Sequence, residues 1–131
     1  MKLSLAAELA VRGAVVLAQQ YGKGPTTLAD VCELRDLSRE YLAKVFGLLA
    51  RADLVTPIRG KNGGYVLARD PKEINLLQII EAVEGPQYLN FCQYDPPKCD
   101  QVDTCKVHHI WTELQEIFEN RLRSASLADC I

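Results

Sequence analysis

Residues 38–69 read SREYLAKVFGLLARADLVTPIRGKNGGYVLAR, and two different sequence periods follow one another in this stretch. In its first half, apolar residues recur every three or four positions, as they do on one face of a helix. These residues are Leu42, Val45, Phe46 and Leu49. Ser38 stands just before them and is a favoured N-cap residue. The pattern predicts a helix from Ser38 to about Ala52 that buries this apolar face.

The second half of the stretch has the composition of a β-hairpin. The runs LVTPI (54–58) and YVLAR (65–69) are rich in β-forming residues, and RGKNGG separates them. Asn-Gly is a strong hairpin-turn signal. Pro57 is expected to confine the first strand to a sheet edge, because proline has no N–H to donate. Positive φ angles are expected at the glycines of the loop, Gly60, Gly63 and Gly64.

A short helix is predicted before this stretch. Thr26 or Thr27 can cap a helix over residues 27–34, and a turn through Arg35–Leu37 then leads into the basic helix that follows Ser38. Two helices joined by a short turn form the outline of a helix-turn-helix. A hairpin directly after the second helix makes the arrangement a winged helix. The simpler interpretation is a surface hairpin that carries two cations.

Three further helices are predicted. Residues 3–20 have an amphipathic helical pattern. Asn75 can cap the helix LLQIIEAVEG, with Gln78 as its capping-box partner and Gly85 as its terminator. The last helix covers about residues 107–125 and has a wide apolar stripe outside any winged-helix core, so we interpret it as a dimerisation helix. The stripe consists of Ile110, Trp111, Leu114, Ile117, Phe118 and Leu122.

Charge is unevenly distributed along the chain, although the net charge is only −2. Residues 35–64 carry six basic and three acidic groups, whereas residues 65–131 carry six basic and eleven acidic groups. The middle segment is therefore the part that can face a polyanion. The sequence contains no phosphate-binding glycine loop and no nucleophile–base arrangement, so an enzyme is not expected.

The first residues, MKLSLAAELAVRGAVVLA, resemble a secretion signal only briefly, because Glu8 and Arg12 interrupt the apolar run. No window is apolar enough for a membrane span. We therefore expect a cytoplasmic protein without a membrane partner. Thiols stay reduced in the cytoplasm, so the five cysteines indicate metal or redox chemistry before disulfides.

Three of the cysteines lie in CQYDPPKCDQVDTCKVHH, residues 92–109. Six residues separate Cys92 from Cys99, and five separate Cys99 from Cys105. Structural zinc sites favour a Cys-x2–4-Cys knuckle, and ferredoxins have Cys-x2-Cys runs, but this loop has neither. A wide loop suits a larger group, an iron–sulfur cluster. A zinc site and free or disulfide-bonded thiols remain as alternatives.

Three cysteines leave a fourth ligand to be found, and two residues could supply it. His108 follows Cys105 closely and is chemically suitable. Glu8 is the second candidate, although its simpler role is an i,i+4 ion pair with Arg12. His109 is expected on the polar side of the last helix.

Together these features predict a mainly α fold, a winged helix-turn-helix with a small β-hairpin wing and a long C-terminal dimerisation helix. We expect a DNA-binding domain over residues 1–85, a cysteine-rich cluster-binding loop over 86–106, and the dimerisation helix with a tail over 107–131. Of the two other cysteines, Cys32 fits a small buried hydrophobe and Cys130 a thiol in a frayed tail.

Four segments of this sequence resemble the winged-helix iron–sulfur-cluster transcriptional regulator family typified by IscR and NsrR. They are MKLS with AVRG near the start, SREYLAKVFGLLARADLV, RGKNGGYVLAR and INLLQIIEAVEGP. The resemblance covers nearly the whole chain, and the wing followed by I-x-LL-x-II-x-A-x-EG is highly specific. It implies a homodimer in which each winged helix contacts one half of an operator in double-stranded DNA.

The resemblance also implies a cofactor. In cluster-binding members, three loop cysteines hold a 2Fe–2S or 4Fe–4S cluster, which implies one cluster per chain on Cys92, Cys99 and Cys105. The fourth ligand is His108 if the chain follows the IscR-like members, or Glu8 of the partner subunit if it follows the NsrR-like members. IscR-like loops have five residues in each gap, so the first gap of six departs from that pattern and leaves the cluster type open.

The implied function is a DNA-binding transcriptional regulator, a repressor, whose operator affinity is controlled by an iron–sulfur cluster that senses redox state, nitric oxide or iron–sulfur supply. The alternative is a cofactor-free or zinc-stabilised regulator that acts through a metabolic enzyme partner. DNA contacts are expected from the wing and from the start of the helix that follows Ser38, which would be the recognition helix. The residues are Ser38, Arg39, Glu40, Tyr41, Lys44, Arg59 and Lys61.

Overall fold

The structure is a computed structural model that describes residues 2–33 and 38–131. Its helices and strands are α1 (Leu5–Gln19), α2 (Leu28–Cys32), α3 (Arg39–Arg51), β1 (Val55–Ile58), β2 (Gly64–Leu67), α4 (Leu76–Glu84) and α5 (His108–Ser124). Three 3-10 turns complete it, η1 (Pro71–Glu73), η2 (Phe91–Gln93) and η3 (Leu127–Cys130). The turn expected through Arg35–Leu37, and the last residue of the helix predicted over 27–34, lie outside the described residues.

Side-chain caps explain where the helices of the winged helix begin. Ser38 Oγ accepts a hydrogen bond at 3.1 Å from the backbone amide three residues later, so α3 starts where the sequence predicts. Thr27 with Asp30, and Asn75 with Gln78, form reciprocal capping boxes at the starts of α2 and α4. Each cap satisfies backbone N–H groups that have no partner inside the helix.

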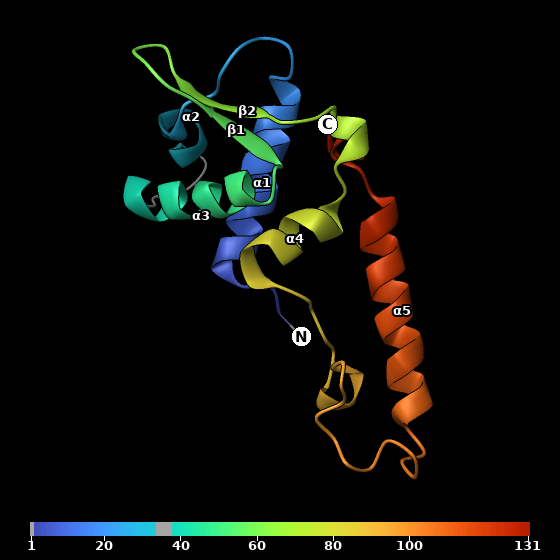
Figure 1. The fold of residues 1–131 in the computed structure, drawn as a ribbon. Coiled ribbons are helices and arrows are strands. Elements are labelled where there is room, and N and C mark those ends of the chain that lie inside the picture. The colour runs from blue at the N-terminus through green and yellow to red at the C-terminus, as the bar shows by residue number, and fades with distance from the viewer. Residues whose placement is uncertain (1, 34–37) are drawn as a thin grey trace.

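Strands β1 and β2 form an antiparallel hairpin in which Val55 pairs with Leu67 and Ile58 pairs with Gly64. Tyr65 is also bridged to Thr26, with backbone hydrogen bonds of 2.9 and 2.8 Å. The segment before α2 is thereby fixed to the hairpin. Figure 1 shows the hairpin loop projecting beyond α2 and α3, as a wing does.

The wing glycines differ in part from the expectation. Gly60 and Gly64 have positive φ angles of 108° and 156°, but Gly63 does not, so that prediction is wrong for Gly63. A Cβ atom on Gly63 would instead collide with the carbonyl oxygen of Ile58. The chain passes so close to the end of β1 that only glycine fits, which is a packing reason rather than a conformational one.

The core lies where α1, α3 and α4 meet around Phe46, a fully buried side chain of α3. The ring of Phe46 lies 4.9 Å from that of Tyr65, which attaches the hairpin to the helices. The buried residues of α3 are the four that the sequence predicts, Leu42, Val45, Phe46 and Leu49.

Replacing Gly13 by alanine is expected to lower the free energy of unfolding by about 1–3 kcal/mol, the usual cost of overpacking a core. A Cβ atom on Gly13 of α1 would lie 2.7 Å from Phe46 Cζ. The matched control is Gly47→Ala in α3, where a Cβ meets no atom within 4 Å. The control should gain up to about 1 kcal/mol from helix propensity. Urea unfolding measures both variants, and equal stabilities would contradict the close packing of α1 on α3.

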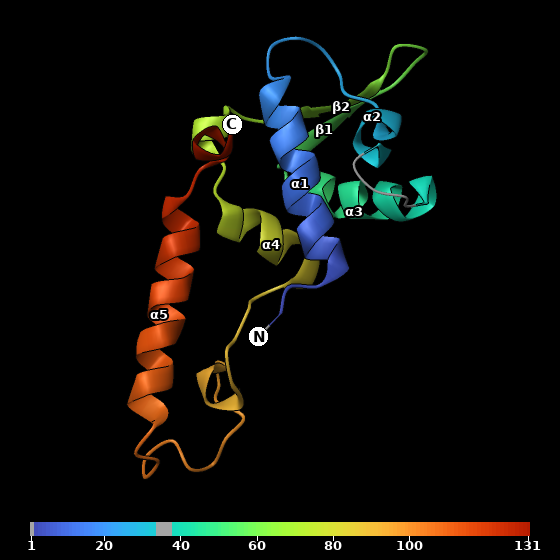
Figure 2. The same ribbon diagram turned by 180° about the vertical axis from the view of Figure 1, so that it is seen from behind.

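The C-terminal residues pack against the winged helix, so the expectation of a frayed tail at Cys130 is wrong. Leu127 is fully buried, and its amide donates to the carbonyl oxygen of Ile74 at 2.8 Å. Ser126 and Asp129 form a capping box, and the backbone hydrogen bond from Ser126 lowers the pKa of Asp129. The chain returns after α5 and packs η3 against α1 and η1. Figures 1 and 2 show the C-terminus beside this region.

The wing and the cysteine-rich segment lie at opposite ends of the molecule, as Figures 1 and 2 both show. Helix α5 runs along one side of the molecule between them, and Gln115 is the one residue of this helix that is buried. Its apolar residues Ile110, Leu114 and Ile117 are 44%, 42% and 59% exposed. In the described part of the chain, no helix is both long and apolar enough to cross a bilayer.

Candidate functional site

A groove separates the start of α3 from the wing. Arg39, the first residue of α3, lies on one side of it, and Ile58 and Gly64 of the hairpin lie on the other. The groove has a volume of about 360 Å³, and Thr27 and Leu28 at the beginning of α2 also line it. Helix α3 and the hairpin wing therefore border one continuous concave surface.

The cations at this surface are available to an external anion. Arg39, Lys44, Arg59 and Lys61 are exposed, and none of them forms an ion pair with another residue in 2–33 or 38–131. Phosphate oxygens are the usual partners of such cations on DNA-binding proteins. Of the remaining predicted DNA contacts, Ser38 and Glu40 are exposed and Tyr41 is half-buried beside the core.

The three loop cysteines line a second cleft, at the far end of the molecule. Cys92, Cys99 and Cys105 all border it, and its volume is about 400 Å³. Trp111 of α5 forms part of the same wall. All five cysteines are free thiols. The fold thus brings together three side chains that are widely spaced in the sequence.

The thiols surround the cleft without converging on one point. Within residues 2–33 and 38–131, no three His, Cys, Asp or Glu side chains are close enough to hold a single metal ion. A tetrahedral zinc ion needs sulfur ligands at about 2.3 Å from one centre. Iron–sulfur clusters take cysteine thiolates as ligands, so the three thiols that border the cleft are of the donor type that such a group requires.

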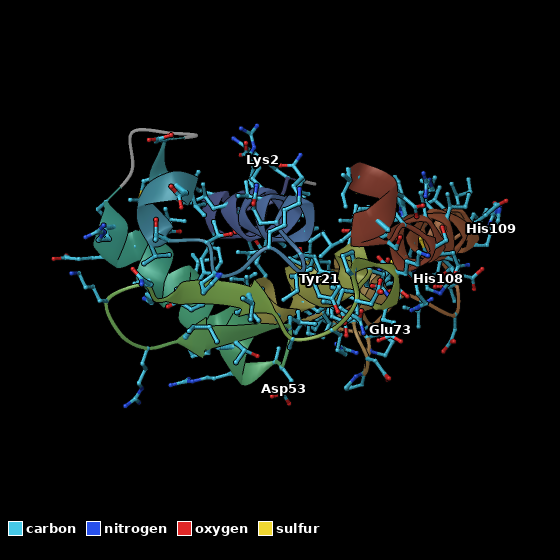
Figure 3. All side chains as sticks on the ribbon, turned by 90° about the horizontal axis from the view of Figure 1, so that it is seen from above. Lys2, Tyr21, Asp53, Glu73, His108 and His109 are labelled. Carbon is cyan, nitrogen blue, oxygen red and sulfur yellow. The ribbon has the colours of Figure 1, made fainter. Side chains whose placement is uncertain are left out.

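His108 lies next to this cleft but does not line it. Its amide donates to the carbonyl oxygen of Cys105 at 3.3 Å, and its ring atom Nδ1 is buried without a hydrogen-bond partner among the described residues. Such an orphaned nitrogen is a reason to look for a missing ligand or water. His109 is exposed, as predicted, and Figure 3 shows it at the outer edge of α5.

Glu8 lies on α1, and its carboxylate is 3.1 Å from the guanidinium of Arg12. This is the i,i+4 ion pair that the sequence predicts as its simpler role. Glu8 does not line the cysteine cleft of its own chain, so a ligand role requires the partner subunit.

The family Rrf2, described as "Iron-dependent Transcriptional regulator", matches residues 3–131 of the chain. The chain belongs to the Rrf2 family. It is therefore a DNA-binding transcriptional regulator rather than an enzyme, and the predicted family is confirmed. The transcriptional regulator IscR of Xenorhabdus nematophila is 33% identical over 131 residues, which cover all of this chain and 79% of the relative.

Solved structures confirm the predicted fold of this Rrf2 protein. CymR, the global cysteine regulator of B. subtilis, matches with a TM-score of 0.82 and 28% identity over 99% of this chain and 95% of CymR. T. potens IscR matches with a TM-score of 0.78 and 32% identity, over 99% of this chain and 85% of that chain. Both likenesses include the winged helix-turn-helix and the long C-terminal helix.

Sequence reasoning missed the residues that fix the cysteine loop of this Rrf2 protein to α5. The buried side chain of Gln115 accepts from the Leu89 amide at 2.8 Å and donates to the Gln87 carbonyl oxygen at 2.7 Å. It thereby anchors the segment that leads to Cys92. The available signal was a glutamine in the middle of the apolar stripe of the last helix.

Proposed function

We propose that this Rrf2 protein is a homodimeric repressor whose operator affinity is set by an iron–sulfur cluster bound at the cysteine cleft. The observation that carries the proposal is that Cys92, Cys99 and Cys105 line one cleft of about 400 Å³. The description of the family as iron-dependent agrees with it. When bound, the cluster supplies a charge and a redox state that can change with the signal.

The residues of the cleft would bind this group and limit its contact with water. The three thiolates hold it, and Val107 and Trp111 provide apolar walls. We propose His108 as the fourth ligand, with Glu8 of the partner subunit as the alternative. Two observations support the first choice: Nδ1 of His108 is buried without a hydrogen-bond partner among the described residues, and His108 stands three residues after Cys105.

We propose α5 as the dimerisation helix, since its apolar side is open to solvent. A groove of about 390 Å³ runs along it, and its walls are almost entirely apolar. The groove is lined by Leu89, Leu114, Ile117, Phe118, Arg121 and Leu122. Contiguous apolar surface of this kind usually marks an interface. The DNA-binding domain over 1–85, the cluster-binding loop over 86–106 and the helix over 107–131 would then have separate tasks.

Measuring operator affinity with and without the cluster tests the proposal. The protein is purified without oxygen and assayed for broad visible absorption, iron and acid-labile sulfide. Its operator is recovered from a random double-stranded DNA library. We expect cluster-loaded and cluster-free protein to differ about 5–150-fold in operator affinity, the usual range of allosteric coupling. Equal affinities would overturn the sensing role and leave DNA binding intact.

The second candidate function is a cofactor-free or zinc-stabilised regulator that acts through a metabolic enzyme. The likeness to CymR, the global cysteine regulator of B. subtilis, favours it. Colourless protein that contains one zinc per chain, or no metal at all, would support this candidate over the first.

Removing single cations should separate base contacts from phosphate contacts. Arg39→Ala is expected to cost about 1–3 kcal/mol of operator affinity and to relax sequence preference, because Arg39 stands at the start of α3. Lys61→Ala, at the wing tip, should weaken binding to all sequences and reduce the salt slope by about 1. Lys72→Ala in η1, away from the groove, is the control. Fluorescence anisotropy at several salt concentrations measures all three, and a uniform loss of affinity would contradict the assignment.

A further inference from the structure

A chain of three hydrogen bonds connects the sulfur of Cys92 to the dimerisation helix. The side-chain amide nitrogen of Gln93, Nε2, lies 3.5 Å from Cys92 Sγ and 3.0 Å from Thr112 Oγ1. Thr112 Oγ1 in turn donates to the carbonyl oxygen of His108 at 3.1 Å. The chain thus begins at one predicted cluster ligand and ends on the backbone of another.

The orientation of the Gln93 amide follows from the donors and acceptors in this chain. The carbonyl oxygen of His108 can only accept, so the single hydroxyl proton of Thr112 belongs to that bond. Thr112 Oγ1 is then left as an acceptor, and it selects the NH₂ group of Gln93 rather than its carbonyl oxygen. The second N–H of the same NH₂ group remains available for Cys92 Sγ.

We infer that Gln93 is a positioning residue of the cysteine cleft, which donates a hydrogen bond to Cys92 Sγ and is oriented for it by Thr112 of α5. The inference rests on the proposed function, because its consequence concerns the cluster. A donor to a ligand sulfur stabilises negative charge there, and hydrogen bonds to sulfur are among the factors that set cluster reduction potentials. Gln93 would therefore raise the reduction potential of a cluster bound at the cleft.

Contacts on both sides of Gln93 hold the cysteine loop in place beside Thr112 of α5. Gln115, one turn after Thr112 on α5, binds the backbone of residues 87 and 89 and so fixes the approach to Cys92. On the other side, the Lys98 amide donates to the Phe91 carbonyl oxygen at 2.9 Å, and the Lys98 ammonium lies 4.1 Å from the ring centroid of Tyr94. The hydrogen bond between Lys98 and Phe91 joins the two ends of the segment between Cys92 and Cys99, and both cysteines border the same cleft.

This arrangement has a regulatory consequence. A change of charge at Cys92 alters the strength of its bond from Gln93, and Thr112 transmits that change to the first turn of α5. The bond from Gln93 is therefore a physical connection between the state of the cleft and the helix that we propose as the dimer interface.

Two pairs of variants test the inference. Thr112→Val removes the hydroxyl group at nearly constant volume, and Thr112→Ser retains it. Gln93→Leu removes the donor, and Gln101→Leu is the control, because Gln101 is an exposed residue of the same loop whose side chain forms no hydrogen bond with the described residues. Each protein is reconstituted anaerobically with iron and sulfide, and its reduction potential is measured by dithionite titration.

Gln93→Leu and Thr112→Val are expected to shift the potential to more negative values, whereas Thr112→Ser and Gln101→Leu should keep the wild-type potential. A purely structural role would leave the potential unchanged in all four loaded variants, and that result would overturn the inference while the proposed function stood.

A measurement on cluster-free protein separates the two proposals further. The side-chain amide resonances of Gln93 in a ¹H–¹⁵N spectrum should move in Thr112→Val and stay in place in Thr112→Ser. Unmoved resonances in Thr112→Val would overturn the hydrogen-bond chain. Wild-type protein that takes up no cluster would instead overturn the proposed function and, with it, the role of Gln93 in setting the potential.

Discussion

Leu127→Ala is expected to lower the free energy of unfolding by about 2–5 kcal/mol, the usual cost of removing a fully buried leucine side chain. Leu127 is 0% exposed and belongs to the same core cluster as Phe46 and Leu49 of the recognition helix. Its amide is also hydrogen-bonded to Ile74, just before α4. The substitution leaves a cavity, because η3 is held in place by its packing on α1 and η1 and by the hydrogen bond to Ile74.

The matched control for this prediction is Ile131→Ala. Ile131 lies four residues further on and is 64% exposed. Surface substitutions usually change stability by less than about 0.5 kcal/mol. Urea unfolding followed by circular dichroism measures both variants. A loss at Leu127 no larger than that at Ile131 would show that η3 is not packed in the core as described.

Replacing any one of Cys92, Cys99 and Cys105 by serine is expected to abolish stable cluster binding. Each of the three lines the cleft, and a serine hydroxyl is a poor ligand for iron compared with a thiolate. The variants should lose visible absorption, iron and sulfide together. Their cluster-free forms should unfold with the wild-type stability, because Cys92 and Cys99 are half-buried and Cys105 is exposed.

Cys130→Ser is the control for the loop cysteines. Cys130 is an exposed free thiol in η3, which packs against α1 and η1 and does not line the cleft. This variant should bind iron and sulfide as the wild type does. If it lost the cluster while the loop variants kept it, the assignment of the cysteine cleft would be wrong.

The same assay decides the fourth ligand. His108→Ala should lower the iron content or change the visible spectrum if His108 is bound, and Glu8→Ala should then have no effect. The reverse result would assign the ligand to Glu8 of the partner subunit. Glu8→Ala also removes the ion pair with Arg12, so the stability of its cluster-free form is measured alongside.

The winged helix could be predicted from the sequence because its determinants are local. Ser38 and Asn75 cap helices through amides only three residues away, and the four apolar residues of α3 repeat within eight positions. Gly85 ends α4 with a positive φ of 76°, as its position predicts. The positive φ predicted for Gly63 is wrong. A side chain is excluded there because the carbonyl oxygen of Ile58, at the end of β1, lies too close.

The contacts that build the cysteine cleft could not be predicted, because they join residues far apart in the chain. Gln93 meets Thr112 across 19 residues, and Gln115 meets Gln87 across 28. Spacing identified the three cysteines as a group, yet it gave no sign of the polar residues on α5 that fix the loop. The burial of Leu127 was equally hidden, since an isolated leucine near the end of a sequence has no periodic pattern around it.

The packing of η3 also sets an order of events during synthesis. The ribosome completes the recognition helix, the wing and α4 long before it reaches Leu127, and early segments generally fold as soon as they form a unit. Here the core of the winged helix is complete only when Leu127, which follows the cysteine loop and α5, has packed beside Ile74. A nascent chain therefore carries every predicted DNA contact before it has a complete core to support them. The complete core around α3 therefore exists only after the cysteine loop and α5 have been made.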